Sequence, residues 1–386
     1  MYTITGEIVR PGGVLSNSAL TITDDGKIGE VGPARLPAAH SGDIDATGLL
    51  VLPGFIDLHV HGGGGADFMH GTADAVRQVV RIHARFGTTG LLATTLTASR
   101  EGTDRAITAA RDVQLAGPGE GEARIFGIHL EGPYICPARR GAQPAEWVRE
   151  PDAHELAHWI ALSKATIKQI TLAPERKGAE EVIRYARANG ITASLGHTDA
   201  SAAEAERAIG WGATQATHVF NAMRGLHHRE PGTVGAALAR PEILCEVIAD
   251  GIHLDPLIVR LTIAAKGVSG VVLITDAIEG TAMPEGEYSL GGQTVIVKNG
   301  TAAFADGTLA GSVLTMNRAF ANIRRFAGVS VPDAAKLSSA NAVRQLGLSG
   351  KFGELIAGAA ADIVVMHPES GEVYWTLVGG RVAYRR

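Results

Sequence analysis

Eight short apolar segments, several of them followed by a helical pattern, run through the middle of this chain. They predict strands at 55–60, 90–96, 125–130, 167–172, 191–195, 215–219, 245–249 and 271–275. Amphipathic segments such as 73–86, 179–189 and 202–210 lie between them and predict helices. Near-continuous apolar strands that alternate with helices are typical of a parallel sheet covered on both faces. Eight such units predict an α/β fold with a (β/α)8, TIM-like barrel.

Strand patterns also flank the barrel segment on both sides. They lie at 3–9, 19–23, 362–366, 374–378 and 381–384. These strands have no partner inside a closed barrel, so we expect them to pair with each other in a small β-sandwich. An open, doubly wound sheet is the weaker alternative for the central part, because no Gly-x-Gly-x-x-Gly motif follows its first strand.

This pattern divides the chain into two expected domains. Residues 1–53 and 351–386 supply the two parts of the β-sandwich, and residues 54–350 supply the barrel. After the eighth strand, short strand patterns separated by Gly-Gly and Asn-Gly turns predict a β-hairpin insertion near 285–308.

Composition excludes several classes of partner. The net charge of the 386 residues is −5, which gives no basic surface for a nucleic acid. The first residues contain no signal-peptide pattern, and no window of about 18 uninterrupted apolar residues predicts a membrane span. The two cysteines, Cys136 and Cys245, form neither a CxxC motif nor a disulfide framework. We therefore expect a soluble, cytoplasmic protein without a nucleic-acid or membrane partner.

His59 and His61 stand at the end of the first predicted strand, in the sequence DLHVH at 57–61. Side chains alternate along a strand, so both imidazoles point to the same side of the sheet. Two convergent imidazoles can form half of a metal site. An isolated His-x-His leaves open the alternative of ordinary polar residues at a strand end. The ends of the later strands favour the metal site.

Further ionisable side chains follow the carboxyl ends of the later strands. Together with the first pair they are His59, His61, Glu131, His197, His218, His253 and Asp276. Catalytic groups of a (β/α)8 barrel lie on this face. His197 alone could be a loop cap and His218 alone a buried, hydrogen-bonded histidine, but the whole set predicts a divalent metal centre. Imidazole and carboxylate ligands suit Zn²⁺ first and Fe²⁺ second.

Six motifs, in chain order, carry a resemblance to a known family. They are PGFIDLHVHG at 53–62, HLEGP at 129–133, GHT at 196–198, THVFNAM at 217–223, ADGIH at 249–253 and TDA at 275–277. With these motifs the sequence resembles the N-acetylglucosamine-6-phosphate deacetylases of the amidohydrolase superfamily over nearly its whole length. The first and last motifs are shared across the superfamily, whereas 130–133 and 218–223 are more specific to the deacetylases.

The resemblance implies roles for the metal-centre residues. Glu131, His197 and His218 match the principal metal ligands, with Glu131 in the place of the carbamylated lysine of other superfamily members. His59 and His61 match a second metal position that some relatives have lost, so one or two ions are expected. Asp276 matches the catalytic acid and base.

The resemblance also implies a small-molecule sugar phosphate as substrate. The matching positions are Ala142, Asn221, Ala222, Arg229, His253, Leu309, Ala310, Gly311 and Ser312. Arg229 and His253 suit a phosphate dianion; the alternative for Arg229 is a solvated loop residue. The resemblance suggests that the phosphate clamp is completed across a homodimer interface.

Position 143 departs from the family, which commonly has a histidine there, whereas this chain has Gln143. A glutamine amide can donate a hydrogen bond to the acetamide carbonyl, but it carries no charge. A solvated loop residue is the alternative for this position.

The implied reaction is hydrolysis of the acetamide of N-acetyl-D-glucosamine 6-phosphate to D-glucosamine 6-phosphate and acetate, in amino-sugar catabolism. A metal would activate water and polarise the carbonyl, and Asp276 would take the proton of the water and deliver it to the departing amine. The alternatives are the same reaction on N-acetylgalactosamine 6-phosphate and a non-catalytic metal-binding module. A cyclic-amide hydrolase is disfavoured, because no lysine stands at a strand end.

Overall fold

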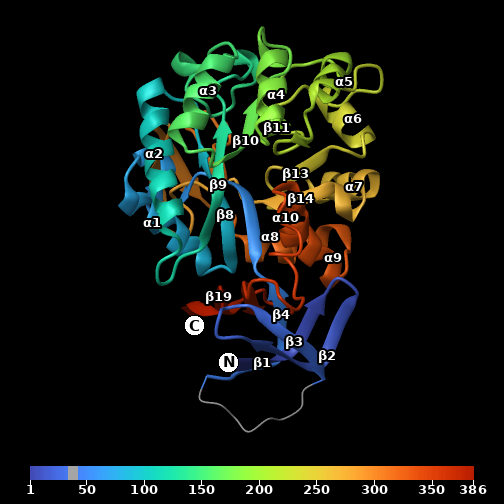
Figure 1. Ribbon diagram of the computed structural model, residues 1–386. Helices are drawn as coiled ribbons and strands as arrows, with labels where there is room; N and C mark the ends of the chain where they lie inside the picture. Colours follow the sequence, from blue (N-terminus) through green and yellow to red (C-terminus); the bar gives the residue numbers. More distant parts are fainter. Residues whose placement is uncertain (34–41) are drawn as a thin grey trace.

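The computed structural model describes residues 1–33 and 42–386, and most of them form a barrel (Figure 1). Its eight parallel strands lie in the order β5 (Phe55–Val60), β8 (Thr88–Thr95), β9 (Arg124–Glu131), β10 (Ile167–Leu172), β11 (Thr192–Leu195), β12 (Gln215–Ala216), β13 (Leu244–Ile248) and β14 (Val271–Ile274). The ends meet where the Asp276 amide donates to the His59 carbonyl at 2.9 Å, and a parallel bridge joins Val60 to Ala277. The predicted (β/α)8 barrel is confirmed.

Helices surround these strands (Figure 1). They are α1 (Ala73–Ala84), α2 (Arg100–Ala116), α3 (Ala153–Leu162), α4 (Ala179–Ala188), α5 (Ala202–Trp211), α6 (Gly232–Ala239), α7 (Pro256–Lys266), α8 (Met316–Ala327), α9 (Val331–Ala335) and α10 (Asn341–Gln345). Single turns complete the set: η1 (Phe68–His70), η2 (Pro137–Arg139), η3 (Ala145–Trp147), η4 (Val268–Gly270) and the π-helical η5 (Lys336–Ala340). Within residues 1–33 and 42–386, no helix combines the length and the hydropathy that a membrane span requires.

Local sequence explains where the helices begin. At the start of α5, the Ser201 hydroxyl accepts from the Glu204 amide, and the Glu204 carboxylate accepts from the Ser201 amide. This capping box satisfies two donors that the first turn leaves free. The side chains of Thr72, Ser99 and Asp152 cap α1, α2 and α3 in a similar way.

The barrel strands are buried along almost their whole length. Every residue of β8, β13 and β14 is buried, because helices cover one side of the strands and side chains from opposite strands fill the other. The apolar residues of the strands and the inner faces of the helices form one continuous core. In such a core a buried charged side chain, such as Glu246 of β13, indicates a specific role.

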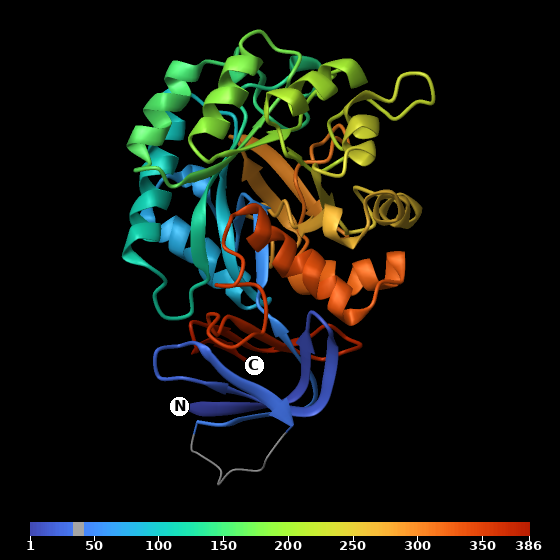
Figure 2. The same cartoon turned by 45° about the vertical axis from the view of Figure 1, so that its right-hand side comes forward.

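A second sheet is built from both ends of the chain. Its seven strands lie in the order β20 (Arg381–Arg385), β19 (Val373–Val378), β18 (Ile363–Met366), β4 (Ile44–Pro53), β1 (Tyr2–Arg10), β2 (Gly13–Ile22) and β3 (Ile28–Pro33). It has its own core, in which Ile4, Leu20 and Ile363 are fully buried. The C-terminal strands lie between the barrel and the N-terminal strands (Figure 2). The prediction of a small β structure formed by the two ends of the chain is confirmed.

Strand β4 connects this sheet to the barrel. It pairs in parallel with β1 and antiparallel with β18, and only Gly54 separates it from β5. The sequence pattern does not predict β4, because its apolar half continues into the first barrel strand almost without a break. Gly54 allows the close approach, since a Cβ atom there would lie 2.2 Å from the Thr89 side chain.

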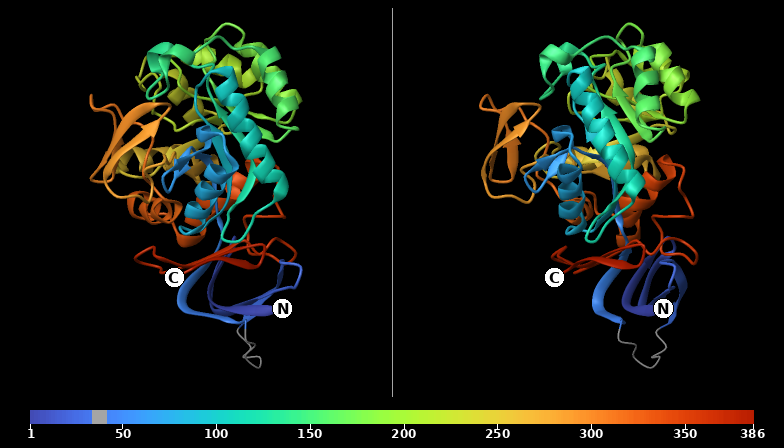
Figure 3. Two further views of the ribbon diagram at one scale, coloured as in Figure 1. Left: turned by 90° about the vertical axis from the view of Figure 1, so that its left-hand side faces the viewer. Right: turned by 60° about the vertical axis from the view of Figure 1, so that its left-hand side comes forward.

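The predicted insertion is a three-stranded antiparallel sheet of β15 (Gly286–Leu290), β16 (Gln293–Lys298) and β17 (Thr301–Ala303). It stands at the edge of the barrel, in orange on the left of both views in Figure 3. A small apolar cluster that includes Leu96, Ile278 and Leu290 attaches it to the barrel. A short strand pair, β6 (Gly62–Gly63) and β7 (Ala66–Asp67), follows the first barrel strand.

Candidate metal centre

Six predicted ligand and catalytic residues meet at the carboxyl ends of the barrel strands. His59 lies in β5 and Glu131 ends β9, while His61 follows its strand directly and His197, His218 and Asp276 each stand two residues beyond theirs. We call Glu131, His197 and His218 the first ligand group, and His59, His61 and Asp276 the second ligand group. In each group one potential ligand atom from every residue lies within 4.8 Å of the others, and all six residues are buried.

Glu131 connects the two groups. Its Oε1 atom lies 3.1 Å from His218 Nε2, 3.2 Å from His197 Nε2 and 3.3 Å from His59 Nε2. Its Oε2 atom lies 3.3 Å from His61 Nε2. On the other side of His61, Asp276 Oδ1 is 3.2 Å from Nε2. The carboxylate of Glu131 therefore occupies the position of a bridge between two sites.

The chemistry of this donor set fits a divalent metal. The Nε2 atoms of His59 and His61 are 3.2 Å apart, and those of His197 and His218 are 3.1 Å apart. His59 has its Nδ1 atom on Glu246 and His197 has its Nδ1 atom on the Arg139 carbonyl. These partners assign the proton to Nδ1 and leave the Nε2 lone pair facing the cluster. Four imidazoles with two carboxylates suit zinc or iron.

The pKa values of the carboxylates in the two ligand groups favour a bound cation. Burial opposes ionisation of Glu131, but the neighbouring His59 and His197 side chains outweigh it and hold the Glu131 pKa well below its usual value. The Asp276 pKa is also lowered, since His59 and His61 overcome the effect of burial. Burial disfavours the charged form of His61, yet hydrogen bonds to Asp276 and Glu131 raise its pKa to about 9. Metal binding must displace such protons, so it weakens as the pH falls.

Three residues of the two ligand groups have a left-handed backbone. The φ angles are 49° at His197, 30° at His218 and 52° at Asp276. Side-chain-bearing residues adopt this conformation at a cost of roughly 1–3 kcal/mol each, and they do so mostly at functional sites. The sixth predicted strand, 215–219, is correspondingly too long: β12 ends at Ala216, because the backbone turns out of the sheet at His218.

A cavity of about 300 Å³ opens beside the cluster, within the range of small-molecule sites. Predicted substrate-binding residues form much of its wall: Ala142, Gln143, Asn221, Ala222, His253, Leu309 and Gly311. Four lining residues were not predicted from the sequence, namely Leu96, Gly141, Leu290 and Thr308. A second cavity of about 320 Å³, lined by Arg124 and Lys168 among others, contains none of the ligand residues.

Three predicted substrate residues lie outside the lining of this cavity. Ala310 is fully buried in the apolar cluster under the insertion. Ser312 donates its hydroxyl to the Thr275 carbonyl, and its amide donates to the Asp276 carbonyl at 2.7 Å, so it supports the Asp276 turn. Arg229 is exposed and contacts His228 on its own loop.

Gln143 is buried, and its side chain points at Glu131 of the first ligand group. Its Nε2 atom donates to Glu131 Oε2 at 2.6 Å, and its Oε1 atom accepts from the Thr97 amide at 2.7 Å. The side chain is therefore held between the cavity wall and a predicted metal ligand, and it is no solvated loop residue.

His253 presents to the cavity an imidazole that is paired with a carboxylate. Its Nδ1 atom lies 2.6 Å from Asp250 Oδ2, and Asp250 also accepts the amides of Ile252 and His253 at 2.8 Å each. Burial lowers the His253 pKa, but the Asp250 carboxylate more than compensates, and the net pKa is raised. A protonated His253 is suited to an anionic part of a substrate.

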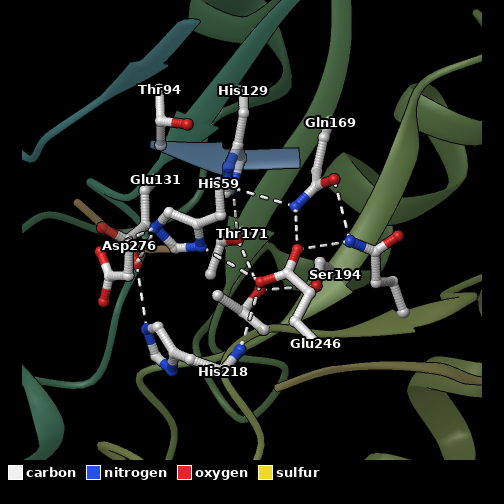
Figure 4. A network of polar contacts seen from close by, with 12 residues as sticks. His59, Thr94, His129, Glu131, Gln169, Thr171, Ser194, His218, Glu246 and Asp276 are labelled. Carbon is white, nitrogen blue, oxygen red and sulfur yellow. Dashed lines mark hydrogen bonds and ion pairs between the residues drawn. The ribbon is translucent and has the colours of Figure 1, made fainter. Parts of the chain in front are cut away.

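A buried polar network that the sequence did not predict lies next to the two ligand groups (Figure 4). Its central residue is Glu246, which is fully buried and contacts His59, His218, Gln169 and Gln215. The available signal was a glutamate inside the apolar strand LCEVI, where an unpaired charge would be unfavourable.

An eight-stranded barrel with histidine and carboxylate ligands at its strand ends defines a metal-dependent barrel hydrolase. The chain belongs to the amidohydrolase family, whose model matches residues 50–383. This assignment covers the barrel and the C-terminal strands.

Similar proteins narrow the assignment. An N-acetylglucosamine-6-phosphate deacetylase from Bacillus subtilis (strain 168) is 40% identical over 379 residues, which are 98% of this chain and 95% of that protein. An N-acetylgalactosamine-6-phosphate deacetylase from Escherichia coli O157:H7 is 38% identical over 318 residues, with 82% and 83% covered. A structure of the Mycobacterium smegmatis N-acetyl-D-glucosamine-6-phosphate deacetylase in complex with N-acetyl-D-glucosamine-6-phosphate superposes with a TM-score of 0.92, at 33% identity and 99% coverage of both chains. The resemblance stated from the motifs is confirmed.

Proposed function

We propose that this chain hydrolyses the acetamide of N-acetylglucosamine 6-phosphate to glucosamine 6-phosphate and acetate, in amino-sugar catabolism. The observation that carries the proposal is that the whole first ligand group, together with His61 and Asp276 of the second, lines one cavity of small-molecule size. Deacetylases that match nearly the full length of the chain support it.

Asp276 is the group that moves the proton. Its carboxylate lines the cavity and is ionised at neutral pH, because His59 and His61 lower its pKa despite burial. Glu131, His197 and His218 would hold a divalent ion, which would supply Lewis-acid chemistry for polarising the carbonyl and activating water. Asp276 accepts the proton of the attacking water and then donates it to the departing nitrogen.

We propose zinc as the metal, with iron second, and two ions per subunit, since each ligand group contains three converging donors. His59→Asn should then remove the ion of the second ligand group and leave the first. Metal analysis of the purified variant should show about half the wild-type ion content. The surface variant His158→Asn, far from the cluster in an exposed pair with Asp104, should keep the full content. Equal ion content in His59→Asn and wild type would show a mononuclear centre.

We also propose a homodimer that completes the phosphate end of the site. Arg229 does not line the cavity of its own chain, and its loop, in yellow-green at the upper right of Figure 2, extends away from the barrel. Large apolar side chains are exposed on this loop and in or near α7: Leu226, Ile252, Leu257 and Leu261. A partner that covers them would bring Arg229 to a neighbouring cavity, where His253 supplies the second cation.

Arg229→Ala should weaken the binding of phosphorylated substrate by about 10–150-fold, since a charge-assisted hydrogen bond contributes roughly 1.5–3 kcal/mol. Activity on unphosphorylated N-acetylglucosamine should barely change, because that sugar has no group for Arg229 to bind. Steady-state kinetics with both sugars measures the difference. Arg184→Ala, which removes an exposed arginine paired with Glu180, is the matched control. An equal loss on both sugars would make Arg229 structural.

The substrate itself is tested by acetate release from N-acetylhexosamine 6-phosphates and their unphosphorylated forms. We expect the glucosamine derivative with its phosphate to have the highest kcat/KM. A preference for the galactosamine derivative would support the alternative function that the Escherichia coli relative suggests. No acetate release from any sugar by the metal-loaded protein would refute the proposal and favour a non-catalytic module.

A further inference from the structure

Glu246 lies next to His59 and His218 and is surrounded by hydrogen-bond donors (Figure 4). Its Oε2 atom accepts from His59 Nδ1 at 3.1 Å and from the His218 amide at 3.2 Å. Its Oε1 atom accepts from Gln169 Nε2 at 2.7 Å and from Gln215 Nε2. An ionised carboxylate accepts about four hydrogen bonds, so its capacity is used completely.

Two of these donors belong to different ligand groups. The bond to His59 places the proton on Nδ1 and leaves Nε2 bare toward the second ligand group. The bond to the His218 amide holds the backbone where it leaves the sheet with a φ of 30°. One carboxylate therefore contacts both halves of the centre.

The charge of Glu246 has no permanent counter-ion nearby. In the part of the chain that the structure describes, no lysine or arginine forms an ion pair with it; its one ion pair is with His59. Gln169 and Gln215 are neutral and hydrogen-bond to each other at 2.9 Å. A fully buried carboxylate without such a partner depends on hydrogen bonds for its stability, and here these bonds come from His59, the His218 amide and the two glutamines.

We propose that Glu246 is a positioning residue for the metal centre, acting mainly through His59 on the second ligand group. It accepts from His59 Nδ1, and in this way it orients the His59 ring and fixes its tautomer. The first ligand group depends on it less, because there Glu246 holds only a backbone amide. This inference rests on the proposed metal-dependent function and assigns a role to a residue that contacts no substrate.

The test is Zn²⁺ binding to the metal-stripped Glu246→Gln variant, measured by competition with a chromophoric chelator. The variant keeps the size of the side chain but removes its charge and turns an NH₂ group toward other donors. The dissociation constant of the second ligand group, which we take as the weaker position, should rise about 10–100-fold. This is the usual effect of losing a partner of a metal-binding histidine. The first ligand group, the tighter position, should keep most of its affinity. Glu155→Gln is the matched control, since Glu155 is buried against Tyr134 and Arg149; it should lower Tm and leave both constants unchanged.

A double-mutant cycle separates positioning from general stability. His59→Asn keeps only the ion of the first ligand group, so adding Glu246→Gln to it should leave the Zn²⁺ affinity of this remaining ion nearly unchanged if Glu246 acts through His59. An equal further loss there, or unchanged affinity in the single variant, would overturn the inference.

Two further outcomes are decisive. If Glu246→Gln does not fold, the ¹⁵N shifts of His59 in wild-type protein decide: a proton on Nδ1 supports the inference and a proton on Nε2 overturns it. If wild-type protein binds no Zn²⁺, the proposed function fails together with the inference; if wild type and variant bind equally, only the inference fails.

Discussion

Glu131→Gln should produce a folded protein that has lost the ion of the first ligand group and, with it, deacetylase activity. The two oxygens of Glu131 lie within 3.1–3.3 Å of all four histidines. An amide in this position loses the negative charge and turns an NH₂ group toward an imidazole nitrogen. Metal affinity should therefore fall by more than the roughly 100-fold upper range for the partners of ligands, and deacetylation should fall to background.

Metal analysis after gel filtration and acetate release measure this effect, and circular dichroism confirms the fold. Glu122→Gln is a suitable control, because Glu122 is equally buried but pairs with Arg77 and Arg81 away from the cluster. Full ion occupancy in Glu131→Gln would show that Glu131 is not a ligand.

The sequence predicts the barrel well where the local signal is strong. β5 and β10 match the predicted segments 55–60 and 167–172 at both ends. β12 is shorter than predicted, since the backbone turn at His218 depends on Glu246 of the neighbouring strand. Such a turn is determined by tertiary contacts, so a local pattern cannot reveal it.

The same distinction applies to the site. The motifs place ligands at strand ends, and the structure brings those side chains together. The partners of these side chains were not predictable: Gln143 binds Glu131 and Thr97, and Glu246 contacts side chains from three other strand segments. Those contacts depend on register across the barrel and on rotamers, which sequence spacing does not encode. For Arg229, contacts within one chain are insufficient, and only an assembly can bring it to a cavity.

Asp276→Asn should remove the general base while preserving the shape of the site. The backbone at this position is held by hydrogen bonds to the His59 carbonyl and from the Ser312 amide, neither of which involves the side chain. An asparagine fits the same space but cannot accept a proton from water. We expect kcat to fall by about 10²–10⁴-fold, the usual contribution of a positioned acid or base, whereas the ion of the first ligand group should stay bound.

Kinetics and metal content must be measured on the same preparation, because Asp276 also belongs to the second ligand group. A loss of both kcat and the first ion would assign Asp276 to metal retention instead of proton transfer. Asp104→Asn, which can still accept the hydrogen bond from Trp159 Nε1, controls for the general effect of the substitution. A near-normal kcat in Asp276→Asn would remove this residue from the mechanism, since no other carboxylate except Glu131 lines the cavity among the described residues.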